Sequence, residues 1–433
     1  MPTRSEITYF GAGPALLPTP VLETAAQALL DYEHTGLGIA EHSHRSEHAA
    51  RIIAAAKADL AAYLGFAPAD YDVLFLQAGG TGEFAASVYN TVGAWVARER
   101  AAVHAALGLA GADEGEGDAE EVVRRLRERI AGGALKLDYI VTGGWSLKAY
   151  QEAVRLLGPE HVNMAADARP LNGAKFGKIP DQREWKLSKD AAMVYYCDNE
   201  TVDGVEFPAF PQVLAPKEGA QPIVVADMSS NILSRRVPVD HHSIIFFGAQ
   251  KNLGCTGVTV AVVKRTLLPP HLKQPSPALL RKLGLPVPPI VFSYETIAQN
   301  NSLYNTLSIF DVFVAGQVLK RLLATYPDKV DGQQAVSDKK AKLIYATLDA
   351  HPGIYKVVPD KSVRSRMNVC FRVIKNGNSE EAEKAFLEQA TARGLTGLKG
   401  HRSVSGIRAS LYNSIMLEEA QKLANFIEEF ARI

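Results

Sequence analysis

The sequence predicts an α/β fold with a mostly parallel sheet in a large domain, followed by a smaller α+β domain. Short, unbroken apolar runs alternate with helical patterns over about the first three hundred residues, as expected for strands that are buried on both faces. From about residue 325, a shorter set of helices and strands completes the chain. Because ligands of parallel sheets usually lie at the carboxyl ends of the strands, we look for chemistry there.

The first part of the chain supplies the elements of this sheet. Helical spacing of alanine, leucine and isoleucine predicts helices over 20–33 and 47–64. Six strands are predicted, at 72–77, 137–142, 193–197, 222–226, 243–248 and 258–263. Residues 100–135, acidic at 112–121, are interpreted as a surface insertion without a catalytic role, and the segment 264–289, rich in proline and leucine, as a surface loop.

The second part repeats the alternation on a smaller scale. The pattern predicts helices over 336–350 and 380–394, strands over 368–374 and 406–412, and a final helix over 416–431.

The composition excludes several classes of protein. Of the 433 residues, 47% are hydrophobic and 22% charged, which rules out a disordered or fibrous chain. The 47 lysines and arginines balance the 47 aspartates and glutamates, so no net charge favours nucleic acid or an anionic membrane. The three cysteines, Cys197, Cys255 and Cys370, form no CxxC pair, which fits a reducing compartment. Without a secretory signal or an apolar run of roughly 18–20 residues, we expect a cytoplasmic protein.

A glycine-rich segment follows the first predicted strand. The sequence AGGTG at 78–82 opens a helical run from Glu83, where backbone N–H groups and the helix N-terminus can hold an anion. It matches neither GxGxxG nor a Walker sequence, which disfavours a nucleotide site. An ordinary glycine-rich turn explains the segment equally well.

Three further residues follow strand ends. Lys251, in GAQKNLG, lies between two apolar strands, where an ammonium is poorly solvated and its pKa falls, so that it can act as an amine nucleophile. Asp227 ends the strand PIVVA, and Trp145 follows the strand LDYIVT. Taken singly, the aspartate fits a helix cap and the tryptophan a core residue. Together with the glycines they fit pyridoxal phosphate. The lysine can bind its aldehyde as a Schiff base, the aspartate can keep its ring nitrogen protonated, and the indole can stack on its ring.

The chain resembles the phosphoserine aminotransferases, class V members of the fold type I pyridoxal-phosphate enzymes, and looks most like their fungal branch. The resemblance spans nearly the whole chain. Its motifs are YFGAGPALLP (9–18), SHRS (43–46), TGEFAA (81–86), CDNETVDG (197–204), VVADMSSNILSR (224–235), GAQKNLG (248–254), NNSLYNT (300–306), SRMNVCF (365–371) and GHRSVSGIRASLYN (400–413).

The resemblance implies a role for each matching residue. Lys251 would form the Schiff base, with Asp227 on the ring nitrogen, Trp145 stacked on the ring and Thr201 on its phenolic oxygen. The cofactor phosphate would be held by Gly80, Thr81, Ser229 and Gln250, and by Asn305 and Thr306 from the other subunit. The anionic groups of the substrates would be bound by His44, Arg45, His401, Arg402 and Arg408. Arginine binds carboxylate and phosphate bidentately, which suits phosphoserine and glutamate.

The resemblance also implies the organisation of the molecule. We expect a large cofactor-binding domain at 19–324 and a small domain formed by 1–18 and 325–433, in a homodimer with composite active sites and no metal. One departure concerns the phosphate site, since many bacterial members carry arginine where this chain has Thr81.

The predicted reaction is amino exchange between glutamate and 3-phosphohydroxypyruvate, giving phosphoserine and 2-oxoglutarate in L-serine biosynthesis. Lys251 would also move the proton as acid and base. Three alternatives remain. A class V enzyme of the alanine–glyoxylate type would not need the histidines and arginines of SHRS and GHRS. A silent pyridoxal-phosphate carrier would not need Asp227. A mere anion-binding scaffold would bind no coloured cofactor.

Overall fold

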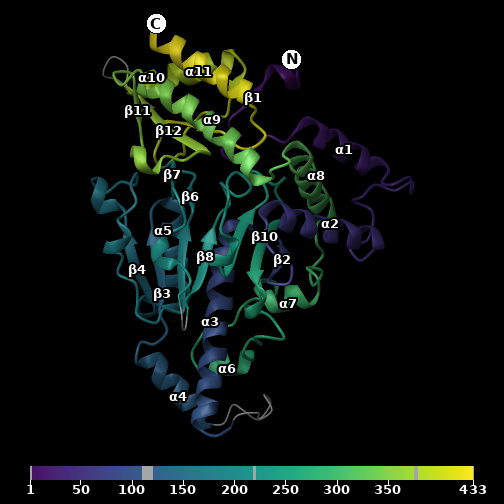
Figure 1. Ribbon diagram of the computed structural model, residues 1–433, viewed down its shortest axis with the longest axis vertical. Helices are drawn as coiled ribbons and strands as arrows, with labels where there is room; N and C mark the ends of the chain where they lie inside the picture. Colours follow the sequence, from purple (N-terminus) through teal and green to yellow (C-terminus); the bar gives the residue numbers. More distant parts are fainter. Residues whose placement is uncertain (1, 110–119, 218–220, 375–378, 433) are drawn as a thin grey trace.

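The computed structural model is built around a seven-stranded sheet (Figure 1). The structure describes residues 2–109, 120–217, 221–374 and 379–432. The strand order is β2-β10-β9-β8-β5-β3-β4. β10 runs antiparallel to both its neighbours, and the other neighbouring pairs are parallel, so the predicted α/β fold with a mostly parallel sheet is confirmed. The strands span Tyr71–Leu76 (β2), Leu137–Val141 (β3), Val162–Asp167 (β4), Met193–Cys197 (β5), Ile223–Asp227 (β8), Ile244–Gly248 (β9) and Thr259–Lys264 (β10).

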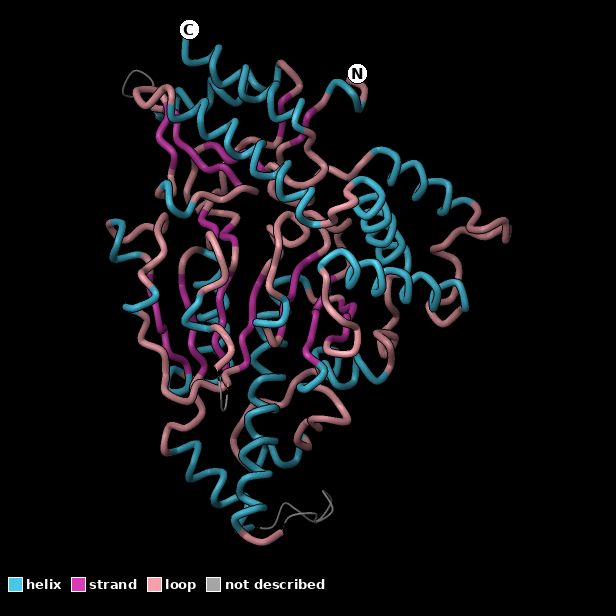
Figure 2. Tube along the Cα trace, in the orientation of Figure 1, coloured by secondary structure: helices cyan, strands magenta, loops and turns pink. Residues whose placement is uncertain are grey.

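Helices cover both faces of this sheet (Figure 2). Successive strand residues point to opposite faces, so that Val73 and Phe75 enter one core while Leu74 and Leu76 enter the other. On the first face pack α1 (Thr19–Leu30), α2 (Glu47–Leu64) and α8 (Ile309–Thr325). On the second face pack α3 (Gly79–Ala106), α4 (Glu120–Ala131), α5 (Gly144–Leu157), α6 (Pro277–Lys282) and α7 (Tyr294–Gln299).

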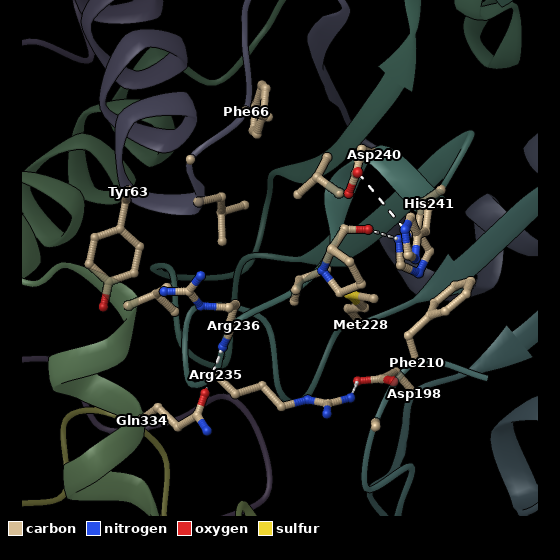
Figure 3. A pocket seen from close by; sticks show the side chains of 18 of the residues that line it. Tyr63, Phe66, Asp198, Phe210, Met228, Arg235, Arg236, Asp240, His241 and Gln334 are labelled. Carbon is tan, nitrogen blue, oxygen red and sulfur yellow. Dashed lines mark hydrogen bonds and ion pairs between the residues drawn. The ribbon is translucent and has the colours of Figure 1, made fainter. Parts of the chain in front are cut away.

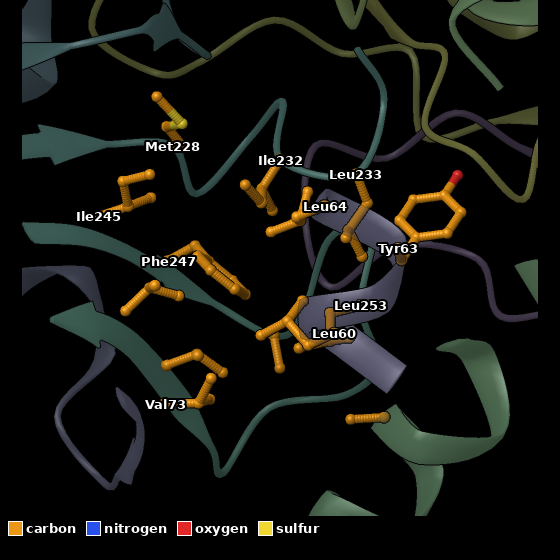
Figure 4. Close-up of a cluster of buried hydrophobic side chains, with 14 of the residues drawn as sticks. Leu60, Tyr63, Leu64, Val73, Met228, Ile232, Leu233, Ile245, Phe247 and Leu253 are labelled. Atoms are coloured by element: carbon orange, nitrogen blue, oxygen red, sulfur yellow. The ribbon is translucent and has the colours of Figure 1, made fainter. Parts of the chain in front are cut away.

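The first of these cores shows how a helix covers the strands (Figure 4). Leu60 and Leu64, on one stripe of α2, belong to the same buried cluster as Val73 of β2 and Ile245 and Phe247 of β9. Residues four positions apart in a helix lie on the same face. The alanine-rich pattern at 47–64 has this spacing, and it predicted the helix with the bounds that the structure shows.

A second unit lies at the end of the molecule where both chain ends are found (Figure 1). It combines α9 (Val330–Asp349), α10 (Ser379–Ala392) and α11 (Leu417–Arg432) with a sheet of order β11-β12-β14. These strands span Tyr355–Val357, Asn368–Val373 and Ile407–Ser410. Near the N-terminus, β1 (Thr8–Tyr9) pairs in parallel with β13 (Leu395–Thr396), and Phe10 is fully buried in the same core. The two domain boundaries stay predictions.

Several elements differ from the prediction. α5, β4 and α8 were not predicted, and α9 begins six residues earlier than expected. The segment 100–135 is not wholly a surface insertion, because α3 extends to Ala106 and Val122 and Leu126 of α4 are fully buried against it. Most of the acidic stretch 112–121 lies outside the described residues. The segment 264–289 contains the short helix α6.

Over the described ranges, no helix is long and apolar enough to cross a membrane. In the part of the chain that the structure describes, the remaining short elements are the hairpin strands β6 (Asn199–Glu200) and β7 (Val205–Glu206) and nine 3-10 turns, at Arg4–Glu6, Pro159–His161, Arg169–Asn172, Gln182–Glu184, Gln212–Leu214, Val239–His241, Arg265–Leu267, Ile290–Phe292 and Lys361–Val363.

Candidate active site

A cavity of about 420 Å³ lies at the carboxyl ends of the parallel strands. It is lined by residues that follow β2, β3, β5, β8 and β9, by a loop near the N-terminus, and by two residues near the C-terminus. Ten of the predicted site residues line it, namely Gly80, Thr81, Trp145, Thr201, Asp227, Ser229, Gln250, Lys251, His401 and Arg408. The fold therefore brings together residues from one end of the chain to the other.

Lys251 lies in the turn that follows β9, with its ammonium inside the cavity. Its Nζ donates a hydrogen bond to Oγ1 of Thr201 at 2.9 Å. A Cβ on Gly13 would lie 3.5 Å from Cγ of Lys251, so the N-terminal loop packs closely on the aliphatic stem. Burial lowers the pKa of Lys251 to about 8, although the neighbouring charge of Asp227 opposes the shift. The amine is thus far closer to its neutral, nucleophilic form at neutral pH than an ordinary lysine.

Asp227 is the last residue of β8, and only 5% of it is exposed. Its Oδ1 accepts a hydrogen bond from the backbone N–H of Ser229 at 2.9 Å. Burial raises the pKa of this carboxyl, while the bond from Ser229 and the charge of Lys251 favour its anionic form. Such a carboxylate is suited to hold a cationic ring nitrogen in the cavity.

The glycine-rich segment forms the N-terminus of α3. Gly79 has a φ of +62°, in the left-handed region that favours glycine, and its N–H donates to Oγ1 of Thr259 at 2.7 Å. Gly80 and Thr81 follow in the first turn, whose N–H groups have no partners within the helix. Gln250 needs the neighbouring glycine, because a Cβ on Gly248 would lie 2.3 Å from its Oε1. This end of the cavity is therefore a suitable anion site.

Trp145 lies in the first turn of α5. Lys148 Nζ lies 4.3 Å from the centre of its indole ring, as a cation–π contact. The indole Nε1 is buried without a hydrogen-bond partner within the described chain. The residue also lines the cavity, so its side chain can contact a ligand there.

Two cationic residues near the C-terminus complete the wall. Arg408 donates from Nη1 to the backbone oxygen of Thr201 at 3.3 Å, and its Nε is buried without a partner in the described structure. His401 is partly buried, and its Nδ1 lies 2.6 Å from Oγ of Ser403. Burial lowers the pKa of His401, and the positive charge of Arg408 adds to this shift. An unsatisfied guanidinium N–H at the cavity indicates a ligand with acceptor oxygens.

Five predicted site residues do not line this cavity. Asn305 and Thr306 are exposed, and Nδ2 of Asn305 donates to Oε1 of Gln77 at 2.6 Å. Arg45 and Arg402 are also exposed, and His44 is partly exposed. Within one chain these residues do not complete the site.

The cavity also has lining residues that the sequence interpretation missed. They are Ala12, Gly13, Pro14, Gly79, Phe84, Cys197, Asn199, Val202, Ser230 and Thr256. All but Thr256 lie within or beside motifs quoted above, so neighbourhood in those motifs was the available signal.

A larger cavity, of about 960 Å³, lies between the C-terminal end of α2, the segment 235–242 and the start of α9 (Figure 3). Its arginines are already paired, because Arg235 forms an ion pair with the buried Asp198 and Arg236 with Asp331. None of the predicted site residues lines it. The smaller cavity is therefore the better candidate for chemistry.

Comparison with known proteins identifies the family of this chain. The family described as aminotransferase class-V matches residues 162–423. The phosphoserine aminotransferase of Saccharomyces cerevisiae is 40% identical over 431 residues, which cover 99% of this chain and 98% of that protein. The chain belongs to the phosphoserine aminotransferases. The likeness to the fungal branch of this family stays a prediction.

Solved phosphoserine aminotransferases have the same fold. The enzyme from Bacillus circulans subsp. alkalophilus is 34% identical, with a TM-score of 0.77 and 98% of each chain covered. The structure of a phosphoserine aminotransferase with bound PLP from Trichomonas vaginalis is 30% identical, with a TM-score of 0.75 and 98% and 99% covered. The chain is thus a pyridoxal-phosphate-dependent aminotransferase of fold type I.

The residues of this phosphoserine aminotransferase fit the cofactor. The cavity offers an amine with a lowered pKa, a buried carboxylate, an indole and a helix N-terminus. The indole Nε1 and Arg408 Nε also lack partners within the described chain. A buried polar atom without a partner is costly, so these atoms indicate groups that a ligand would satisfy.

Proposed function

We propose that this enzyme exchanges an amino group between glutamate and 3-phosphohydroxypyruvate, forming phosphoserine and 2-oxoglutarate in L-serine biosynthesis. The observation that supports this most directly is the pairing of Lys251 with Asp227 in one cavity with Arg408. Membership of the phosphoserine aminotransferases then favours a substrate with a distal phosphate.

We assign the cofactor contacts as follows. When bound, pyridoxal phosphate supplies an aldehyde that takes up the amino group and a ring that withdraws electrons. Asp227 would hold the ring nitrogen in its protonated form, Thr201 would bond the phenolic oxygen, and Trp145 would stack on the ring. The phosphate would be held by Gly80 and Thr81 at the start of α3, with Ser229 and Gln250 from the neighbouring cavity wall.

Lys251 has two tasks in this proposal. Its neutral amine, which the lowered pKa favours, would hold the cofactor through its aldehyde. With substrate bound, the free amine at Nζ would take the proton from the substrate carbon as a base and later release it as an acid. Enclosure by Gly13 and Thr201 keeps Nζ inside the cavity and limits access of water.

The cationic residues bind different anionic groups of the substrate. Arg408, which lines the cavity, binds the carboxylate next to the reacting carbon in every substrate. His401 and Arg402 of GHRS, with His44 and Arg45 of SHRS, bind the distal anion. Arginine forms bidentate bonds to phosphate and carboxylate alike, so one site serves phosphoserine and glutamate in turn.

A homodimer with composite active sites is part of the proposal. The exposure of Asn305, Thr306 and Arg45 in a single chain supports it, since exposed side chains are accessible to the site of a partner. The exposed apolar side chains of Ile290 and Val291 lie in a turn packed on α3, whose N-terminus forms the phosphate site. An apolar surface of this kind is typical of an interface.

We further propose a cytoplasmic location. The three cysteines are free, two of them buried, which suits a reducing compartment.

The spectral half-reaction of purified protein tests the proposed reaction. The visible absorbance of the bound cofactor should change rapidly with phosphoserine and with glutamate, and slowly with alanine. Phosphoserine carries the distal anion that the cationic cluster requires, and alanine has none. A faster change with alanine than with phosphoserine would instead support an alanine–glyoxylate type of enzyme, and a chain without visible absorbance would contradict the cofactor itself.

A further inference from the structure

Two buried carboxylates beside the cavity have no role in the proposed reaction. Glu200 is fully buried and Asp203 is 6% exposed. Both belong to the CDNETVDG motif and flank Thr201, which lines the cavity. A buried carboxylate is costly unless its oxygens are hydrogen-bonded, so the partners of these two groups indicate their purpose.

Their partners are the first N–H groups of α5, the helix that carries Trp145. Oε2 of Glu200 accepts from the backbone N–H of Trp145 at 2.8 Å, and Oε1 accepts from the backbone N–H of Ser146 at 2.9 Å. The hydroxyl of Ser146 also donates to Oε1 at 2.5 Å. Oδ2 of Asp203 accepts from the backbone N–H of Gly144 at 2.9 Å. Three consecutive N–H groups are therefore satisfied by carboxylates from another part of the chain.

The residue before α5 offers no side chain to these three N–H groups, and the hydroxyl of Ser146 accepts only from the preceding N–H groups of Thr142 and Gly143. N-terminal N–H groups lack partners within a helix, and the residue before the helix usually supplies one through serine, threonine, aspartate or asparagine. Here that residue is Gly143. A Cβ on Gly143 would lie 2.3 Å from Cγ and Cδ of Glu200. Its backbone is extended, with φ −168°. Glycine is therefore required for the space that Glu200 occupies, not for an unusual backbone angle.

The turn that carries the carboxylates also contacts Arg408. Nη1 of Arg408 donates to the backbone oxygen of Thr201, between the two acidic residues. Burial raises the pKa of Glu200 to about 8, with the charge of Asp203 adding to the shift. Burial also raises the pKa of Asp203 to about 6, and the positive charge of Arg408 opposes this. The two carboxyl groups of Glu200 and Asp203 thus lie between two positive partners, the N-terminus of α5 and Arg408.

We propose that Glu200 and Asp203 are positioning residues for Trp145. They replace the missing cap of α5 and hold its first turn, and with it the indole, against the cofactor site. The turn at 200–203 that carries both carboxylates also contains Thr201 and contacts Arg408. The position of the indole is therefore coupled to the positions of Thr201 and Arg408 in the cavity. This inference rests on the proposed function, in which Trp145 covers the cofactor ring.

A double-mutant cycle on cofactor affinity tests the inference. Apoprotein of the wild type, Glu200→Gln, Trp145→Ala and the double variant is titrated with pyridoxal phosphate, and the dissociation constant is read from visible absorbance. Gln keeps the volume of Glu but places an N–H₂ group against one of the two backbone donors. We expect the change to weaken affinity at least about tenfold in the wild type and less than about threefold in Trp145→Ala.

Asp138 provides a matched control. It is fully buried and accepts from the backbone N–H of Ser188 at 2.6 Å, but it lies at the start of β3, far from the carboxyl end of the strand. Asp138→Asn should lower thermal stability and leave the affinity for pyridoxal phosphate unchanged. A loss of affinity in Asp138→Asn equal to that in Glu200→Gln would mean that any disturbed buried carboxylate has this effect, and would overturn the inference.

The remaining outcomes are also decisive. Glu200→Gln could weaken the affinity for pyridoxal phosphate equally in the wild type and in Trp145→Ala, or leave the affinity of the wild type unchanged. Either result would show that Glu200 does not act through Trp145. If Glu200→Gln does not fold, Asp203→Ala, which removes the acceptor of the Gly144 N–H, replaces it in the same cycle with the same expectations. A wild type that takes up no pyridoxal phosphate would contradict the proposed function, whereas normal uptake with an unaffected Glu200→Gln would contradict this inference alone.

Discussion

At the scale of single residues, the environment of Lys251 makes the site chemically distinct. Its amine is enclosed by the N-terminal loop and bonded to Thr201, and burial lowers its pKa to about 8. The sequence already indicated this, because a lysine between two unbroken apolar strands is poorly solvated. It could not indicate the contact with Gly13, which depends on how distant segments meet.

The first prediction concerns the pH dependence of cofactor uptake by the apoprotein. Only the neutral amine of Lys251 can attack the aldehyde, and the fraction of neutral amine rises with pH up to its pKa. The second-order rate of uptake should therefore increase about tenfold per pH unit below pH 8 and level off above it. Stopped-flow absorbance measures this rate. Lys251→Ala, which lacks the amine, should show no such pH-dependent phase. A rate that keeps rising to pH 10 would mean that the amine behaves as an ordinary lysine.

The second prediction separates the two arginines of the C-terminal motif. Arg402→Ala should lower the half-reaction efficiency with phosphoserine at least about tenfold, because truncating one partner of a hydrogen-bonded charge pair that is buried in the assembled site costs roughly 2–5 kcal/mol. The loss with glutamate should be smaller, because its distal carboxylate has fewer acceptor oxygens and less charge. Arg408→Ala should impair phosphoserine, glutamate and alanine alike, since all three share the carboxylate that Arg408 binds.

A matched control for this experiment is Arg183→Ala. Arg183 is exposed like Arg402, but it pairs with Asp181 away from the cavity, so its loss should leave all three half-reactions unchanged. The assignment fails if Arg402→Ala impairs alanine as much as phosphoserine, or if Arg408→Ala spares alanine.

At the scale of elements, the strands buried on both faces and the edge strand β2 were predictable, and the opposite edge strand β4 was not. β5 and β9 are unbroken apolar runs, because both of their faces meet helices. β4, with the sequence VNMAAD, lies at the edge of the sheet, where one side has no neighbouring strand and polar residues are tolerated. The helix α5 was missed for a different reason. The N-terminus of this helix has no capping residue just before it in sequence. Glu200 and Asp203, more than fifty residues away, accept hydrogen bonds from its first N–H groups instead.

The third prediction concerns a histidine that joins two elements. His242, after the turn Val239–His241, is buried between Tyr196 of β5, whose hydroxyl lies 2.6 Å from Nε2, and the backbone oxygen of Pro238, 2.8 Å from Nδ1. Both bonds are made by the neutral ring, and burial lowers its pKa from 6.5 to about 4. The unfolded chain therefore binds more protons between pH 6.5 and 4, so His242 destabilises the fold progressively as pH falls through this range, by roughly 3 kcal/mol at most.

Thermal unfolding of His242→Gln measures this effect. The variant should be less stable than the wild type at pH 7, and the difference in melting temperature should shrink as pH falls from 6.5 towards 4. His34→Gln serves as the control, because the side chain of His34 is fully exposed, and its melting temperature should follow the wild type at every pH. A constant difference between His242→Gln and the wild type would refute the role of this histidine in acid sensitivity.

At the scale of the whole molecule, the sequence indicated which motifs form the site but not how one chain leaves it incomplete. Ten of the predicted residues gather in one cavity, while Asn305, Thr306 and Arg45 stay on the surface. Their exposure follows from the placement of their loops, which no local pattern determines. This is why the composite site could be expected only from the family resemblance.

The fourth prediction tests the composite site directly. Asn305→Ala should weaken retention of pyridoxal phosphate, because the partner's phosphate site loses a donor. Mixing it with Lys251→Ala should restore activity in part, since one site of each mixed dimer then has both an intact lysine and an intact asparagine. Gel filtration with absorbance at the cofactor band measures retention, and the half-reaction with phosphoserine measures rescue. A fully active monomer, or mixtures no more active than the Asn305→Ala parent, would contradict the composite site.

The pairing of β1 with β13 bears on how the protein is made. During synthesis, Thr8 leaves the ribosome long before Leu395, its partner in the parallel pair. Until then the N-terminal segment has no strand to join, and Gly13 has no fixed place over Lys251. Long-range pairing of this kind forms late, because the intervening chain must first be ordered. Until the C-terminal unit has folded, the N-terminal loop therefore cannot cover Lys251, and its amine stays accessible to other aldehydes. Stable binding of pyridoxal phosphate then has to wait until the whole polypeptide has been synthesised.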